Sequence, residues 1–131
     1  MLNNKNIVVT GALQGIGRQT VTSLANLGAN IWACAHIIDD NFLDYCAEIA
    51  SANGTNIYPL EADFTSIDSV KEMSGKIFKS KLPIDGLVNV AGVTKDAIFQ
   101  MTSSSDIRNI YDINVVSTLV LTQAICKRMQ R

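Results

Sequence analysis

Hydrophobic and polar positions follow two patterns that alternate along the 131-residue chain. Short apolar runs rich in β-branched and small residues predict strands at residues 6–10, 30–35, 55–60 and 86–90. After each run, apolar residues recur every three or four positions, which predicts helices at residues 16–27, 39–52, 66–78 and 105 to about 129. These patterns place Ile16, Leu43 and Ile67 on the apolar faces of the first three helices.

Strands that alternate with helices of this length form right-handed βαβ units, in which helices cover both faces of a mainly parallel sheet. The sequence therefore predicts one α/β domain with a doubly wound parallel sheet. In such sheets, ligands bind beyond the carboxyl ends of the strands, beside the first strand-to-helix turn.

The segment TGALQGIG, residues 10–17, occupies that first turn. Glycines gather where a backbone must turn tightly or let a ligand approach, and Gly11, Gly15 and Gly17 lie within seven residues. The spacing differs from Gly-x-Gly-x-x-Gly, because Thr20 stands where the frame from Gly15 would need a glycine. A glycine turn that leads into a helix suits phosphate binding. A structural turn without a ligand remains the alternative.

Composition narrows the class of protein. A hydrophobic fraction of 47% and a charged fraction of 18% indicate a globular domain. The formal net charge of −1 and the scattered basic residues argue against a nucleic-acid partner. The apolar run at the N-terminus is too short for a signal peptide or a membrane span, so we expect no membrane partner and a cytoplasmic location.

The cysteines and the histidine do not form a metal-binding pattern. Cys34, Cys46 and Cys126 are widely spaced, and His36 is the single histidine of the chain. We expect neither a disulfide framework nor a metal site, and we expect each cysteine to be a small buried apolar residue.

Four motifs in order carry a resemblance that spans residues 4 to 130. They are the glycine turn, Asp63 after the third strand, NVAG at residues 89–92 and INV at residues 113–115. The chain resembles the short-chain dehydrogenase/reductase family, and within it the 3-oxoacyl-[acyl-carrier-protein] reductases, notably across GLVNVAGVTKDAIFQM and YDINVVSTLVLTQA. The resemblance implies a Rossmann-type sheet, of which this chain holds four βα units, and NAD(P)-dependent reduction of 3-oxoacyl thioesters in fatty acid biosynthesis.

The resemblance also assigns a cofactor site. Asp63 would accept a hydrogen bond from the adenine amino group beside the Phe64 amide, although Asp63 could instead cap the following helix. The residues that the resemblance assigns to cofactor binding are Gly11, Gln14, Gly15, Ile16, Gly17, His36, Asp63, Phe64, Asn89, Ala91 and Gly92. Val90 replaces the commoner second asparagine of the ribose-binding motif.

The end of the second strand favours NADP and leaves NAD possible. A ribose-binding carboxylate is expected at that strand end, where the sequence reads ACAH and Asp39 comes later. Gln14 replaces the arginine of many phosphate-preferring relatives, so His36 and Arg18 remain as cationic candidates. His36 could equally be an exposed loop histidine.

Asn114 is the candidate catalytic residue. The resemblance implies that it lies at a helix kink and holds a water that passes protons to a lysine, and the alternative is a polar residue turned to solvent or an interface. No tyrosine of the chain is followed four residues later by lysine. We therefore expect the N-terminal part of a longer enzyme whose catalytic Ser, Tyr and Lys follow Arg131, with residues 1–131 inactive alone.

Two alternatives stay open for the function. One is a catalytically silent dinucleotide-binding module. The other is an oligomerisation module that uses the last helix, on which Ile107, Ile110, Tyr111, Val115, Leu119 and Leu121 are apolar. In the enzyme interpretation the partners are a small or acyl-carrier-bound carbonyl substrate and further copies of the chain, as a dimer or tetramer.

Overall fold

The computed structural model describes residues 1–129 and contains one parallel four-stranded sheet in the order β3-β2-β1-β4. The strands are β1 (Asn6–Val9), β2 (Asn30–Ala35), β3 (Ile57–Glu61) and β4 (Gly86–Val88). This is the order with which a Rossmann-type doubly wound sheet begins. The predicted fold class is confirmed.

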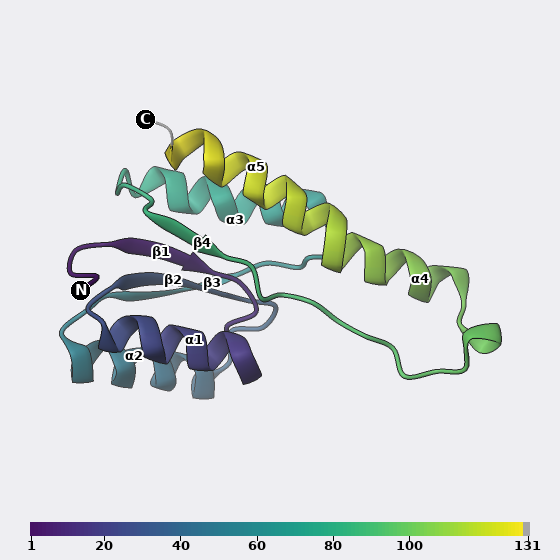
Figure 1. The fold of residues 1–131 in the computed structure, drawn as a ribbon, viewed down its shortest axis with the longest axis horizontal. Coiled ribbons are helices and arrows are strands. Elements are labelled where there is room, and N and C mark those ends of the chain that lie inside the picture. Colours follow the sequence, from purple (N-terminus) through teal and green to yellow (C-terminus); the bar gives the residue numbers. More distant parts are fainter. Residues whose placement is uncertain (130–131) are drawn as a thin grey trace.

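The helices form a layer on each side of the sheet (Figure 1). They are α1 (Gly15–Asn26), α2 (Asp40–Asn53), α3 (Ile67–Lys79), α4 (Ser104–Tyr111) and α5 (Thr118–Met129). In Figure 1, α1 and α2 lie below the sheet, α3 and α5 lie above it, and α4 extends beyond it toward a long loop. The loop contains a 3-10 turn, Phe99–Met101, and a π-helical segment, Asp112–Ser117, joins α4 to α5.

Alternation along the central strands builds two cores. On β1, Ile7 and Val9 pack into the core between the sheet and the layer of α1 and α2. Val8 packs into the core between the sheet and the layer of α3 and α5. On β2, Ile31 and Trp32 divide between the cores in the same way. Strand side chains point alternately to opposite faces, so the continuous apolar runs of the sequence supply both layers at once.

The predicted elements match in order, with shifts of one or two residues at their ends. The strand predicted at 86–90 stops at Val88 because the amides of Val90 and Ala91 donate to the Thr10 hydroxyl rather than to a neighbouring strand. The helix predicted from 105 to about 129 begins at Ser104 and is interrupted by the π-helical segment.

Some predicted core positions lie outside the core. Ile16, Leu43 and Ile67 have exposed fractions of 77%, 43% and 40%. Each lies within the first four residues of its helix, close to the carboxyl end of the preceding strand. Of the apolar residues expected on the last helix, only Leu121 is buried. The others lie on α4, on the π-helical segment or on the outer side of α5.

Candidate functional site

A cavity of about 550 Å³ opens at the carboxyl ends of the strands. Its walls come from the glycine turn, the ends of β2 and β3, the loop after β4 and Ile113 of the π-helical segment. This volume lies within the range of small-molecule and cofactor sites. All the residues assigned above from the family resemblance line the cavity except Asn89 and Asn114. Whether each of them binds a cofactor stays a prediction.

The three glycines of the turn differ in what surrounds them. A Cβ at Gly11 would lie 2.8 Å from the Ala91 nitrogen, and a Cβ at Gly17 would run into the Gly11 carbonyl oxygen. A Cβ at Gly15 would meet nothing within 4 Å. Gly11 and Gly17 therefore permit close packing of the backbone inside the protein, and both also line the cavity. Gly15, with φ of +57°, is the glycine that leaves space open.

Thr10 fixes the loop after β4 against this turn. Its side chain is buried, and its hydroxyl oxygen accepts hydrogen bonds from the amides of Val90 and Ala91, each at 3.1 Å. Thr10 is not among the site residues predicted from the sequence. A hydroxyl at the end of an otherwise apolar strand, just before a glycine, is the signal that could have identified it.

The end of β3 presents a carboxylate to the cavity. Asp63 Oδ1 accepts hydrogen bonds from the Thr65 amide at 2.9 Å and from the Thr65 hydroxyl at 2.6 Å. These bonds lower the pKa of Asp63, with a smaller contribution from His36. The alternative that Asp63 caps α3 is wrong, because Ser66 accepts the hydrogen bond from the Ser69 amide at the start of that helix. Asp63 is thus a charged hydrogen-bond acceptor at the cavity.

Asn89 faces away from the cavity. Its amide nitrogen donates to the Thr122 hydroxyl on α5 at 3.0 Å, and only its neighbours Val90, Ala91 and Gly92 line the cavity. The side chain of Asn89 therefore ties the end of β4 to the helix layer above the sheet.

Asn114 lies in the π-helical segment and holds the loop after β4. Its Oδ1 accepts from the Val93 amide at 2.7 Å, and its Nδ2 donates to the Val93 carbonyl oxygen at 2.8 Å. π-Helical segments occur often at functional sites. The side chain is directed at this loop rather than at open solvent, and the proton-relay role stays a prediction.

Arg18 lies outside the cavity lining. Its guanidinium is 4.0 Å from the centre of the Tyr45 ring and donates to the Leu13 carbonyl oxygen at 3.3 Å. Asp39 is also engaged, since its Oδ1 accepts from the Phe42 amide at 2.8 Å as the cap of α2. Of the two cationic candidates, only His36 lines the cavity.

The expectation of buried cysteines holds for two of the three and is wrong for Cys126. Cys34 and Cys46 are buried, whereas Cys126 is exposed because it follows the inward-facing Ile125 by one step of about 100° around α5. Within residues 1–129, no group of His, Cys, Asp and Glu side chains could hold a metal ion. Over the same residues, no helix is long and apolar enough to span a membrane.

Comparison with known proteins identifies the class. The family described as short chain dehydrogenase matches residues 5–131, and the chain belongs to that family. It is 30% identical over 128 residues to a 3-oxoacyl-[acyl-carrier-protein] reductase of Staphylococcus epidermidis, covering 98% of this chain and 52% of that protein. It is 36% identical over 125 residues to an L-xylulose reductase of Caenorhabditis elegans, covering 95% and 47%.

A solved structure shows the same fold. A short chain dehydrogenase from Burkholderia cenocepacia, in complex with NADP, superimposes with a TM-score of 0.90 at 25% identity, covering 98% of this chain and 52% of that chain. The chain thus spans about half the length of the curated relatives that it matches.

Proposed function

We propose that this chain is the dinucleotide-binding part of an NADP-dependent carbonyl reductase. The observation that carries the proposal is the start of α1. Asp39, Ser66 and Ser103 cap α2, α3 and α4 with their side chains, whereas Gln14 provides no side-chain cap for α1. The first amides of a helix have no acceptor within it, so this helix start offers N–H groups and a positive dipole end to a phosphate.

The residues around this helix start fit a dinucleotide. Gly15 leaves open space at the turn, and Ala91 and Gly92 have side chains small enough for the backbone to approach a ribose. Asp63 is held in its charged form and can accept a hydrogen bond from an adenine amino group. The cavity walls are therefore suited to phosphate at one end and to a base at the other.

NADP is favoured over NAD by two observations. The Burkholderia cenocepacia relative was solved in complex with NADP. In this chain, the residue that follows β2 is His36, and Asp39 is engaged in capping α2. A free carboxylate at this strand end would instead bind the ribose hydroxyl of NAD.

The reaction would be reduction of a 3-oxoacyl thioester, a substrate class supported by the named reductase of Staphylococcus epidermidis. When bound, the nicotinamide supplies the hydride. The chain's own residues bind and orient the dinucleotide, and Asn114 positions the loop after β4 through its two hydrogen bonds to Val93. Residues 1–131 lack a Tyr-x-x-x-Lys pair, so we propose that they bind dinucleotide without turnover.

Assembly through the last helix is part of the proposal. Tyr111, Val115 and Leu119 have exposed fractions of 61%, 42% and 58%, and they continue an apolar surface from α4 to α5. Exposed apolar surface of this kind marks interaction sites. We propose that a further copy of the chain covers it.

The decisive experiment compares two glycines. Gly15 and Gly54 have φ of +57° and +64°, and neither would place a Cβ within 4 Å of another atom. Gly54 ends α2, so Gly54→Val carries the same backbone strain away from the cavity. We expect Gly15→Val to abolish NADP and NAD binding in calorimetry while Gly54→Val binds normally. Equal affinity in both variants would overturn the assignment.

A catalytically silent dinucleotide binder is the second candidate, favoured by the missing Tyr-x-x-x-Lys pair. Oxidation of NADPH with a 3-oxoacyl thioester or with L-xylulose separates the candidates. Turnover by the whole natural protein supports the reductase, and binding without turnover there supports the silent module.

A further inference from the structure

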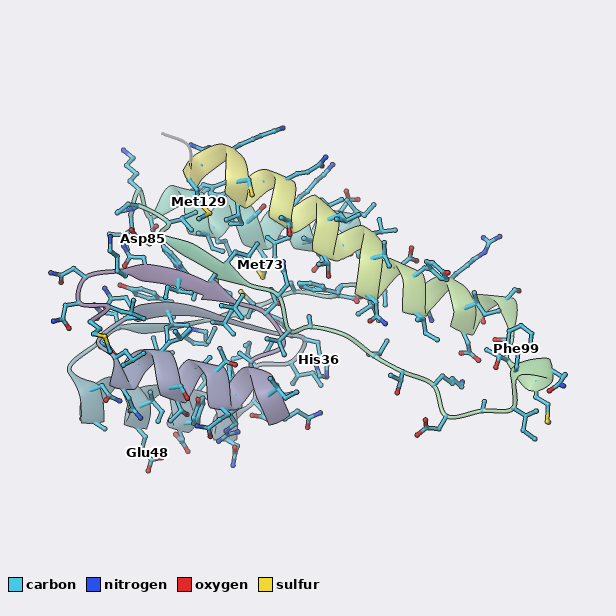
Figure 2. All side chains as sticks on the ribbon, viewed as in Figure 1. His36, Glu48, Met73, Asp85, Phe99 and Met129 are labelled. Atoms are coloured by element: carbon cyan, nitrogen blue, oxygen red, sulfur yellow. The ribbon has the colours of Figure 1, made fainter. Side chains whose placement is uncertain are left out.

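The cavity contains few charged groups. Apart from Cys34, His36 and Asp63 are the only ionisable side chains among the residues that line it. The Cys34 thiol is also in the wall, but burial raises its pKa to about 12 and keeps it neutral. The lining includes neither lysine nor arginine. Figure 2 shows His36 at the end of the sheet where the long loop leaves β4.

The elements that neighbour His36 carry charged groups that are engaged elsewhere or exposed. On α1, Arg18 is stacked on Tyr45. Before α2, Asp39 is a helix cap, and Asp40 lies in the first helical turn. On β3, Glu61 pairs in register with Ala35 and is exposed.

The loop after β3 contributes Asp63, which is the charged group that shares the cavity with His36. His36 and Asp63 are therefore the two groups through which the charge of this part of the cavity wall can change. Histidine is the residue type that gains or loses charge between about pH 5 and 8.

We propose that His36 makes the choice between the two dinucleotides depend on pH: its protonated ring balances Asp63 and binds the 2′-phosphate of NADP, and its neutral ring gives little preference. This inference rests on the proposed dinucleotide function and adds a regulation of that site. The ligand feature that is recognised is a phosphomonoester on the adenosine ribose, which NAD lacks.

The sign of the dependence follows from linkage. A bound phosphate favours the charged imidazole, so binding of NADP is coupled to proton uptake. The extra affinity for NADP is fully present below the pKa of the free imidazole and is lost as the pH rises through the pKa of the complex. An opposite charge shifts a pKa by about one unit or more, which corresponds to about a tenfold change in the dissociation constant of NADP.

The experiment measures dissociation constants of NADP and NAD by calorimetry between about pH 6 and 8.5, a range that covers histidine titration. We expect the ratio of the NAD constant to the NADP constant to fall about tenfold across this range. Repeating the NADP titration in buffers with different ionisation enthalpies should show uptake of a fraction of a proton. His36→Gln should remove both effects, and His36→Arg should keep a high ratio at every pH.

The variants separate the possible causes. The phosphate of NADP also titrates near pH 6, and a pH dependence that persists unchanged in His36→Gln would assign the effect to the phosphate and overturn the inference. A pH-independent ratio in the unmodified protein would overturn it too. If neither NADP nor NAD binds at any pH, the proposed function itself fails. His36 is exposed, so we expect unchanged circular dichroism in both variants.

Discussion

The two ends of the sheet use polar residues in opposite ways. At the amino ends of the strands, Asn6, Asn30 and Asn56 bind one another and the backbone across three strands. At the carboxyl ends, the helix start at Gly15 is uncapped and Asp63 faces an open cavity. Figure 2 shows the two ends through Asp85 on one side and His36 on the other.

The amino end is a closed network. Asn30 Nδ2 donates to Asn6 Oδ1 at 3.1 Å, and Asn30 Oδ1 accepts from the Asn56 amide at 2.9 Å. Asn6 Nδ2 donates to the Pro83 carbonyl oxygen at 3.0 Å, and the Asn6 amide donates to Asp85 at 2.8 Å. The polar groups of this end therefore bind one another and stabilise the register of the strands.

The difference between the two ends indicates which polar groups are available to bind a ligand. Polar groups that are already paired stabilise the fold, and a ligand would have to compete with those pairs. Donors and acceptors that face a cavity can instead pair with a ligand at little cost to the fold. Substitutions at the amino end should therefore change stability without changing binding, and substitutions at the carboxyl end should mostly do the reverse.

Gly17→Val should have the largest effect, and it marks an exception at the carboxyl end. A Cβ there would run into the Gly11 carbonyl oxygen, which is backbone and cannot move away cheaply. We expect a loss of about 3 kcal/mol in the free energy of unfolding, the upper part of the usual range for overpacking. Urea unfolding measures this loss. Gly75→Val is the control for helix propensity, because a Cβ at Gly75 meets nothing within 4 Å. Equal losses in the two variants would contradict the packing role of Gly17.

Asn6→Ala should cost about 2 kcal/mol, because it leaves the Asn30 amide nitrogen and the Pro83 carbonyl oxygen without this partner near a buried position. The affinity for NADP should not change. Asp63→Ala is the matched substitution at the other end, and there we expect weaker NADP binding with less than about 0.5 kcal/mol lost in stability. A large stability loss in Asp63→Ala, or weakened binding in Asn6→Ala, would break the contrast between the ends.

The sequence was enough to predict the layers and the position of the cavity, because both depend on local periodicity and on the glycine turn. The order of the elements, the parallel sheet and the location of Gly15 beside a cavity all follow from such local signals. The resemblance added Asp63, Ala91 and Gly92, which line the same cavity.

The side-chain partners could not be predicted in the same way, because they depend on which strands and helices become neighbours. Asn30 meets Asn6 only because the register of β1 and β2 places them opposite each other. Arg18 turns from the cavity because α2 brings Tyr45 beneath it. No periodic pattern within one element contains this information.

Asn114→Ala should have a moderate effect and tests how the open end is held together. The variant loses two hydrogen bonds to the Val93 backbone, and exposed bonds of this kind contribute about 1 kcal/mol together. We expect faster hydrogen exchange at the Val93 amide and weaker NADP binding through a looser loop. Asn114→Asp keeps an acceptor for the Val93 amide and loses the donor, so its exchange rate should be intermediate. Unchanged exchange at Val93 in the alanine variant would contradict the positioning role.

The smallest effect should come from acid, at the amino end. The hydrogen bond from the Asn6 amide, assisted by Lys5, lowers the pKa of Asp85 below its ordinary value of 3.8. A lowered pKa in the folded state means that Asp85 stabilises the protein above that ordinary value, and that this contribution is lost as the pH falls through the folded-state pKa. We expect Asp85→Asn to reduce the stability at neutral pH by less than about 1 kcal/mol. The variant should also flatten the decline in the free energy of unfolding below about pH 4.

Urea unfolding at a series of pH values checks this, with Asp44→Asn on the exposed side of α2 as the control. The Asp63 carboxylate at the open end also has a lowered pKa, caused first by the Thr65 hydroxyl. In Asp63→Asn, acid should therefore change the stability in the same direction, and only this variant should also change the affinity for NADP. If Asp85→Asn altered NADP binding as well, the closed network and the cavity would be coupled through the sheet, and the two ends would not be independent.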